Sequence, residues 1–170
     1  AAGAEMLELR MDFLETLEAG SVTALIAEVR DAGGGRIPVI VTCRDRKEGG
    51  AKSHPDELRM LTLLKAVEAG ADFIDLEYAN FVRPEIGHTI RAALATRPKS
   101  RLILSAHDFA GRLSDAHGLY REISQACPTV VPKLVYTARH INDCFEAFDL
   151  LHESNGDRIV LCMGEAGLTS

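Results

Sequence analysis

Short apolar runs alternate with longer amphipathic stretches along this chain. The runs are rich in Val and Ile, which is typical of the buried strands of parallel sheets. We therefore expect six β-strands. They are expected at Glu5–Leu9, Ile37–Cys43, Phe73–Leu76, Leu102–Ala106, Val130–Tyr136 and Ile159–Met163.

The segments between these runs show helical spacing and helix-ending residues. Ser21 is expected to cap a first helix, which the glycines at 33–35 end. A second helix is expected to open at Pro55-Asp56 and to close at Gly70. Its apolar face is expected to hold Leu58, Leu61, Leu64 and Ala66 or Val67. Three more helices are expected over residues 83–95, 114–126 and 138–154.

A strand followed by a helix, repeated at about 30 residues per unit, predicts a parallel α/β fold. Two architectures fit this pattern, a doubly wound open sheet and a closed (β/α)8 barrel. A nucleotide-binding sheet would carry a Gly-rich phosphate loop after its first strand, and the chain has none there. The Gly33–Gly35 run follows a helix instead. No linker or repeat divides the sequence, so we expect one domain over residues 1–170.

Composition narrows the classes of function. The net charge of −6 argues against nucleic acid as the main partner, because phosphate binding favours a basic surface. No apolar run approaches the ~20 residues that span a bilayer, and no basic-then-apolar signal segment opens the chain. We therefore expect no membrane partner and a cytoplasmic location. Because the chain does not begin with Met, we interpret it as a fragment or a trimmed chain.

Cysteine and histidine positions predict no metal site. The cysteines lie far apart without a C-x-x-C pair, so we expect reduced thiols that are mostly buried; they are Cys43, Cys127, Cys144 and Cys162. Most histidines fall in expected loops or helices, where solvation is the default; these are His54, His88, His117, His140 and His152. No pair of them has metal-ligand spacing with a carboxylate.

Ionisable residues cluster at the carboxyl ends of the expected strands, where barrel enzymes keep their chemistry. Each of these ionisable residues could instead have a purely structural role. His107 could be structural, and Glu8 and Arg10, which share one strand face, could form a salt bridge over the core. Asp75 and Glu77 could do the same.

Lys133 is harder to explain structurally. It lies inside an otherwise apolar run, where a lysine must either extend its amine to water or be buried at a cost. Desolvation and nearby cations lower the pKa of a lysine, and the neutral amine attacks carbonyl groups. Lys133 is therefore a candidate Schiff-base lysine.

Six segments together resemble the type I 3-dehydroquinate dehydratase family, in order and at expected strand ends. They are Glu8–Asp12, Thr42–Arg44 with Glu48–Gly50, Gly70–Glu77, Ser105–Phe109, Pro132–Lys133 and Met163–Ser170. The resemblance implies a (β/α)8 TIM barrel. Since the family's barrel has eight strands and the chain holds six, we expect its first and last β/α units to be lacking here.

The resemblance also implies a reaction and the residues that perform it. Lys133 would form an imine with the C3 ketone of 3-dehydroquinate. His107 would remove the C2 proton and then protonate the departing C1 hydroxyl. Glu48 would orient and tune His107. The product would be 3-dehydroshikimate, an intermediate of aromatic amino-acid biosynthesis, although a catabolic quinate role uses the same reaction.

The remaining implied residues bind substrate, and no metal or cofactor is needed. Glu8, Arg10 and Arg44 would hold the hydroxyls and carboxylate of the substrate, with Met163 packed near its ring and Ser170 in the last motif. A homodimer is implied by the resemblance alone. Two other functions stay open: another Schiff-base barrel enzyme, such as a class I aldolase, and a non-catalytic homologue that binds a quinate-like ligand.

Overall fold

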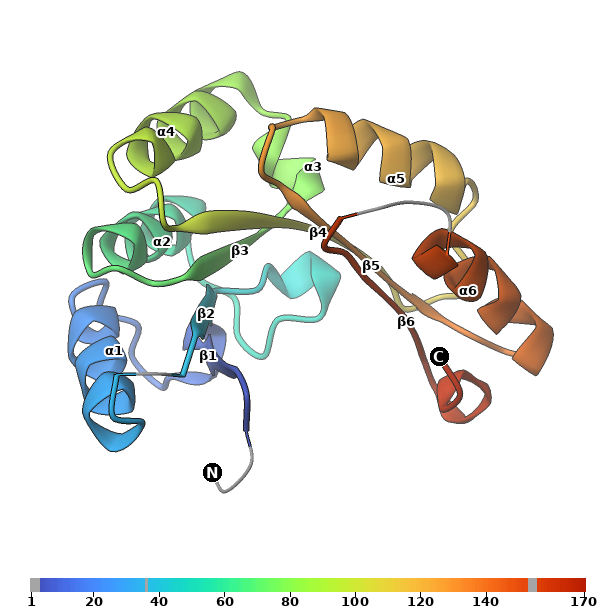
Figure 1. Ribbon diagram of the computed structural model, residues 1–170, viewed down its shortest axis with the longest axis horizontal. Helices are drawn as coiled ribbons and strands as arrows, with labels where there is room; N and C mark the ends of the chain where they lie inside the picture. Colours follow the sequence, from blue (N-terminus) through green and yellow to red (C-terminus); the bar gives the residue numbers. More distant parts are fainter. Residues whose placement is uncertain (1–3, 36, 153–155) are drawn as a thin grey trace. The chain divides into compact units, whose positions relative to one another are not determined.

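The computed structural model describes residues 4–35, 37–152 and 156–170 (Figure 1). The chain divides into two compact units, residues 1–102 and 103–170, with the boundary inside the fourth strand. Across the described residues, no helix is both long and apolar enough to cross a membrane.

The first unit has three neighbouring parallel strands, each followed by helical segments. The strands are β1 (Leu7–Arg10), β2 (Val39–Thr42) and β3 (Phe73–Glu77). The helices are α1 (Ser21–Ala32), α2 (Asp56–Glu68), α3 (Tyr78–Phe81) and α4 (Pro84–Ala95), with one-turn helices η1 (Met11–Phe13) and η2 (Arg46–Glu48).

The second unit repeats the arrangement with β4 (Arg101–Asp108), β5 (Val131–Thr137) and β6 (Ile159–Met163), again parallel. Its helical segments are α5 (Ala116–Gln125), η3 (Ile141–Asp143), α6 (Cys144–His152) and η4 (Glu165–Gly167). All six expected strands are therefore confirmed, and so is a parallel α/β fold.

Strand register separates an apolar face from a polar face in the first unit. Leu9 pairs with Val41, and Val41 pairs with Ile74, so these side chains point to one side. Helix α2 packs against β2 and β3, and α1 and α4 pack against α2. Residues that alternate with the apolar set, such as Arg10, Thr42 and Asp75, point to the other side.

The second unit shows the same separation. Leu104, Leu134 and Val160 share the face on which α5 packs against β5 and α6 against β6. The other face carries Lys133 and His107. A doubly wound sheet would need helices on both faces of its strands, so the packing within each unit favours the barrel type of β/α unit.

The helices differ from the expected ones in four details. Ser21 is the first residue of α1 rather than its cap, and its hydroxyl donates to the Glu18 carbonyl at 2.7 Å. Helix α5 starts after Asp115, which caps it by accepting from Gly118 N–H. Helix α6 starts only at Cys144, because His140 and Asp143 first close a one-turn helix between them. The unexpected helix α3 follows β3 directly. The last two residues of the expected final helix, 153 and 154, lie outside the described residues.

The buried face of α2 also differs from the expected apolar stripe. Leu61 is 45% exposed, whereas Arg59 is only 1% exposed and faces inward together with Leu63 and Ala66. The expected start and end of this helix are confirmed, since α2 begins at Asp56 and Gly70 follows it with a φ of 82°. The sequence therefore located the helix and the buried Ala66 and Val67, but Leu61 was placed on the buried face incorrectly and the buried Arg59 was not expected.

Candidate active site

The first unit places Glu8, Arg10 and Thr42 on one face at the carboxyl ends of β1 and β2. The Thr42 hydroxyl donates to Glu8 Oε1 at 2.5 Å. Arg10 does not pair with Glu8. It makes two parallel hydrogen bonds to Asp12, from Nε at 2.9 Å and from Nη2 at 2.8 Å. The structural alternative of a Glu8–Arg10 salt bridge is therefore replaced by an Arg10–Asp12 pair.

Asp12 is a fully buried carboxylate that the sequence did not single out as a site residue. It also accepts hydrogen bonds from the backbone N–H groups of Arg44, at 3.2 Å, and Ala51, at 2.9 Å. Burial by itself would raise the pKa of Asp12, but the hydrogen bonds from Arg10, Ala51 and Arg44 outweigh it and lower this pKa. Asp12 thus ties β1 to both ends of the segment that carries Glu48.

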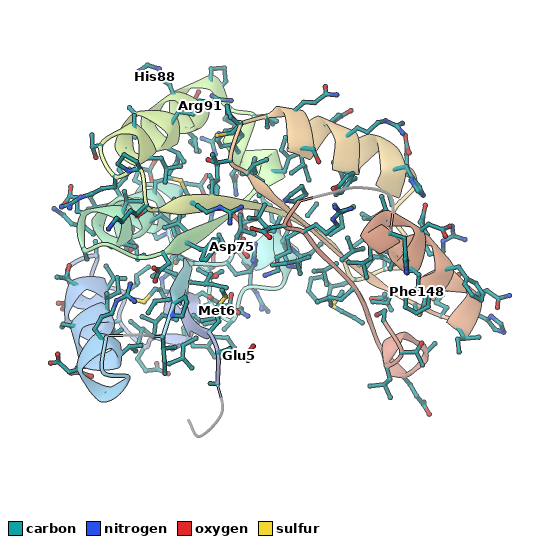
Figure 2. All side chains as sticks on the ribbon, viewed as in Figure 1. Glu5, Met6, Asp75, His88, Arg91 and Phe148 are labelled. Carbon is teal, nitrogen blue, oxygen red and sulfur yellow. The ribbon has the colours of Figure 1, made fainter. Side chains whose placement is uncertain are left out.

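Arg44 extends from the end of β2 into a buried pair of carboxylates. Its guanidinium lies 2.8 Å from Asp75 and 3.0 Å from Glu77 (Asp75 is labelled in Figure 2). Burial opposes the charged form of Arg44, yet the two carboxylates together raise its pKa. The predicted substrate-binding arginine is therefore a fixed, charged group whose orientation is set by its acidic neighbours.

Glu48 lies on a one-turn helix shaped by two glycines. Gly49 has a φ of 84°, which favours glycine, and it ends η2. A Cβ on Gly50 would stand 2.3 Å from the Arg44 carbonyl oxygen, so only glycine fits there. The Asp45 carbonyl accepts from both Glu48 N–H and Gly50 N–H at 2.9 Å. The Glu-Gly-Gly sequence therefore has a local structural reason.

The second unit brings Lys133 and His107 to the same face of neighbouring strands. Lys133 pairs with Ser105 in the β4–β5 register, and His107 lies two residues further along β4. With ~3.3 Å per residue and ~4.8 Å between strands, their Cα atoms lie about 8 Å apart. Both side chains are half-buried. Two long side chains at this spacing can reach adjacent atoms of one small ligand.

Met163 and Ser170 lie at the carboxyl end of β6. Met163 pairs with Thr137 and shares the face of Lys133. The Ser170 hydroxyl accepts a hydrogen bond from the Cys162 backbone N–H at 2.7 Å and donates one to the Gly167 carbonyl at 2.9 Å. In this conformation the hydroxyl of Ser170 therefore holds the end of the last motif against β6.

The cysteines are reduced thiols, and three of the four are buried, as expected. Burial raises the pKa of Cys43 to about 12. Of the other five histidines, three are exposed as expected, whereas His54 and His117 are half-buried. Within the described ranges, no group of three His, Cys, Asp or Glu side chains is arranged to hold a metal ion.

Comparison with known proteins identifies relatives along the whole chain. The family model for type I 3-dehydroquinase matches residues 1–170. The 3-dehydroquinate dehydratase of Desulfotalea psychrophila is 32% identical over 173 residues, which cover 99% of this chain and 71% of that protein. The bifunctional 3-dehydroquinate dehydratase/shikimate dehydrogenase of Arabidopsis thaliana is 30% identical over 99% of the chain, or 26% of its own length.

Solved structures agree on the fold. A type I 3-dehydroquinate dehydratase from Clostridium difficile, determined with covalently modified comenic acid, superposes with a TM-score of 0.85 over 99% of this chain and 69% of that one, at 21% identity. The enzyme from Enterococcus faecalis gives a TM-score of 0.80 over 97% of this chain and 70% of that one, also at 21% identity. Because the family model matches the whole chain, the chain belongs to the type I 3-dehydroquinase family.

Proposed function

We propose that this chain converts 3-dehydroquinate to 3-dehydroshikimate through a Schiff base on Lys133, and so acts as a hydro-lyase of the shikimate pathway. The observation that carries this proposal is the placement of Lys133 and His107 on one face of neighbouring strands, within a fold whose family performs this reaction. A lysine amine and an imidazole about 8 Å apart at their Cα atoms suit two adjacent carbons of one substrate.

Lys133 supplies the electron sink. Its neutral amine attacks the C3 ketone, and loss of water from the carbinolamine gives an imine. The protonated imine withdraws electrons from the neighbouring C2–H bond, so this proton becomes acidic enough to be removed near neutral pH. Hydrolysis of the product imine then returns the free amine and releases the ketone.

His107 moves the proton. Its neutral imidazole accepts the C2 proton, and the resulting imidazolium then protonates the C1 hydroxyl as it leaves as water. One residue thus acts first as base and then as acid. Met163, on the same face as Lys133, packs against the ring of the substrate, and the Ser170 hydroxyl lies beside it, bonded to the N–H of Cys162.

The first unit supplies the binding groups. Asp75 and Glu77 keep the Arg44 guanidinium charged and fix its orientation. Arg44 therefore binds an anionic or hydroxylated group of the substrate through directional hydrogen bonds. Glu8 and Arg10 bind hydroxyls of the substrate, and Glu48 takes the orienting role that the family resemblance implies. We also propose that residues 1–170 form one domain, which contributes six β/α units of a (β/α)8 barrel. The protein is proposed to be a homodimer in the cytoplasm.

Covalent trapping tests the proposal. Intact-protein mass spectrometry after incubation with 3-dehydroquinate and borohydride should show one reduced adduct on the parent chain. Lys133→Ala should show none, whereas Lys65→Ala, which removes an exposed lysine of α2 paired with Glu68, should still show it. Peptide mapping should place the adduct on Lys133. A folded parent chain without an adduct would reject the proposed function.

A further inference from the structure

Arg59 is the largest fully buried side chain of the described residues, although it lies on a helix that covers the strands from outside. A buried guanidinium is costly unless its N–H groups are paired. Arg59 meets this condition with four acceptors. They are the Cys43 carbonyl at 3.0 Å from Nε, Asp45 at 3.1 Å and Asp56 at 3.0 Å from Nη1, and Glu77 at 2.5 Å from Nη2.

These acceptors surround the backbone of Arg44. The Cys43 carbonyl precedes it and the Asp45 side chain follows it, so Arg59 holds the chain on both sides of the residue. Glu77 joins the two arginines directly. Its Oε2 accepts from Arg59 at 2.5 Å, while its Oε1 accepts from Arg44 at 3.0 Å and from the Asp45 backbone N–H at 2.9 Å.

The same contacts reach the turn that carries Glu48. The Asp45 side chain accepts from Lys47 N–H at 2.9 Å and so caps η2. The Asp45 carbonyl accepts from the N–H groups of Glu48 and Gly50. Arg59 is therefore linked through Asp45 to the turn that carries Glu48.

We propose that Arg59 is a positioning residue for the substrate-binding Arg44 and for Glu48, the residue with the orienting role. This inference rests on the proposed function for the roles of those two groups. The planar fork of arginine is required, because one guanidinium must donate in three directions to a carbonyl and separate carboxylates. A lysine would keep the charge but would lose the fixed geometry.

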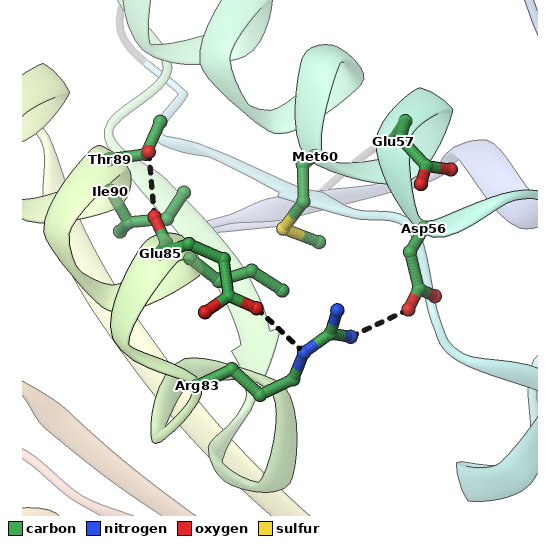
Figure 3. A pocket seen from close by; sticks show the side chains of 8 residues that line it. Asp56, Glu57, Met60, Arg83, Glu85, Thr89 and Ile90 are labelled. Carbon is green, nitrogen blue, oxygen red and sulfur yellow. Dashed lines mark hydrogen bonds and ion pairs between the residues drawn. The ribbon is translucent and has the colours of Figure 1, made fainter.

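A matched arginine lies on the outer side of the same network. Figure 3 shows Arg83 bonded to Asp56 at 2.7 Å and to Glu85 at 3.3 Å, beside a cavity of about 250 Å³ between α2 and α4. Arg83 shares Asp56 with Arg59 but makes no hydrogen bond or ion pair with the described 43–45 segment. Arg83→Lys therefore makes the same chemical change without touching the backbone around Arg44.

The first experiment needs no ligand. Hydrogen exchange of the Glu48 and Gly50 amides should become at least about tenfold faster in Arg59→Lys, because a tenfold change corresponds to loss of one hydrogen bond of ordinary strength. Arg83→Lys should leave both amides within about twofold of the parent. Unchanged exchange in a folded Arg59→Lys chain would overturn the inference.

The second experiment measures binding of quinate, which has a carboxylate and hydroxyls but no ketone and so cannot form an imine. Arg59→Lys should weaken its affinity about tenfold. Leu63→Val, a destabilising change of a buried residue on the same helix, should leave it unchanged, which separates positioning from stability. Equal losses of quinate affinity in Arg59→Lys and Leu63→Val would mean that Arg59 only stabilises the fold.

Asp45→Asn provides a second route if Arg59→Lys does not fold. Asp45 is less deeply buried than Arg59. The substitution keeps the shape of the capping side chain and removes the negative charge that pairs with Arg59. It should also weaken quinate binding and speed exchange of Glu48 N–H; parent-like values would reject the positioning role. If the parent forms no borohydride adduct, the proposed function fails, whereas the exchange result still decides whether Arg59 orders the turn.

Discussion

Replacing Asp12 should cost more stability than replacing any exposed carboxylate of the chain. Asp12 is fully buried and accepts two hydrogen bonds from Arg10 and one each from the backbone N–H groups of Arg44 and Ala51. Asp12→Ala leaves two largely buried N–H groups without acceptors, at about 1–3 kcal/mol each. The partly exposed Arg10 can be solvated, so its loss adds about 1 kcal/mol or less.

We therefore expect Asp12→Ala to lower the free energy of unfolding by about 4 kcal/mol, a large part of the stability of a typical domain. Asp12→Asn keeps the side-chain volume but places an amide NH2 group against N–H donors. We therefore expect it to lower the free energy of unfolding by about 2 kcal/mol. Urea unfolding followed by circular dichroism measures both values, provided that the slopes agree. Asp31→Asn, an exposed residue of α1, should change stability by less than about 0.5 kcal/mol.

The pH dependence gives an independent check. The pKa of Asp12 is lowered in the folded chain, so its charge stabilises the fold fully above the unfolded value of about 3.9. That contribution is lost as pH falls through the lower folded pKa. The stability gap between the parent and Asp12→Asn should therefore be constant near neutral pH and shrink below about pH 4. A parent and an Asp12→Ala chain of equal stability at pH 7 would refute this account of the buried carboxylate.

Three further predictions follow from single contacts. Gly50→Ala should destabilise the chain by about 2 kcal/mol in urea unfolding, since its Cβ would meet the Arg44 carbonyl at 2.3 Å, whereas Gly20→Ala has open space and should be neutral. Tyr136→Phe should lower the thermal midpoint by about 2–4 °C, because its hydroxyl donates to the Asp143 carbonyl at 2.7 Å; an unchanged midpoint would mean that water replaces it. Iodoacetamide at pH 8 should label the half-buried Cys127 before the buried Cys43, whose pKa is about 12, and peptide mapping that finds Cys43 labelled first in the folded chain would contradict this order.

Local patterns in the sequence were sufficient to locate the strands. Apolar runs of Val and Ile mark strands because a buried parallel strand needs apolar side chains. In this type of fold the strands also alternate with helices along the sequence. The residues that follow each run then fall at the carboxyl ends of the strands. His107 was found in this way and Lys133 by its place inside an apolar run, and the register shows that they share a face.

The buried face of α2 and the partners of the charges could not be found in this way. Periodicity follows apolar residues, so the expected apolar face included Leu61 and made no use of Arg59, whereas the structure exposes Leu61 and buries Arg59. Arg59 is buried because three carboxylates from separate parts of the chain, Asp45, Asp56 and Glu77, converge on it.

The sequence by itself determined the order of the elements and the places where chemistry can occur, because these depend on residues close together in the chain. Only the tertiary structure decided that Arg10 pairs with Asp12 rather than Glu8, and that Asp75 and Glu77 both engage Arg44. Coulombic and hydrogen-bond energies depend on separations of a few ångströms between residues up to 33 positions apart in the sequence. No local pattern encodes those distances, which arise when parallel strands bring their carboxyl ends to one edge.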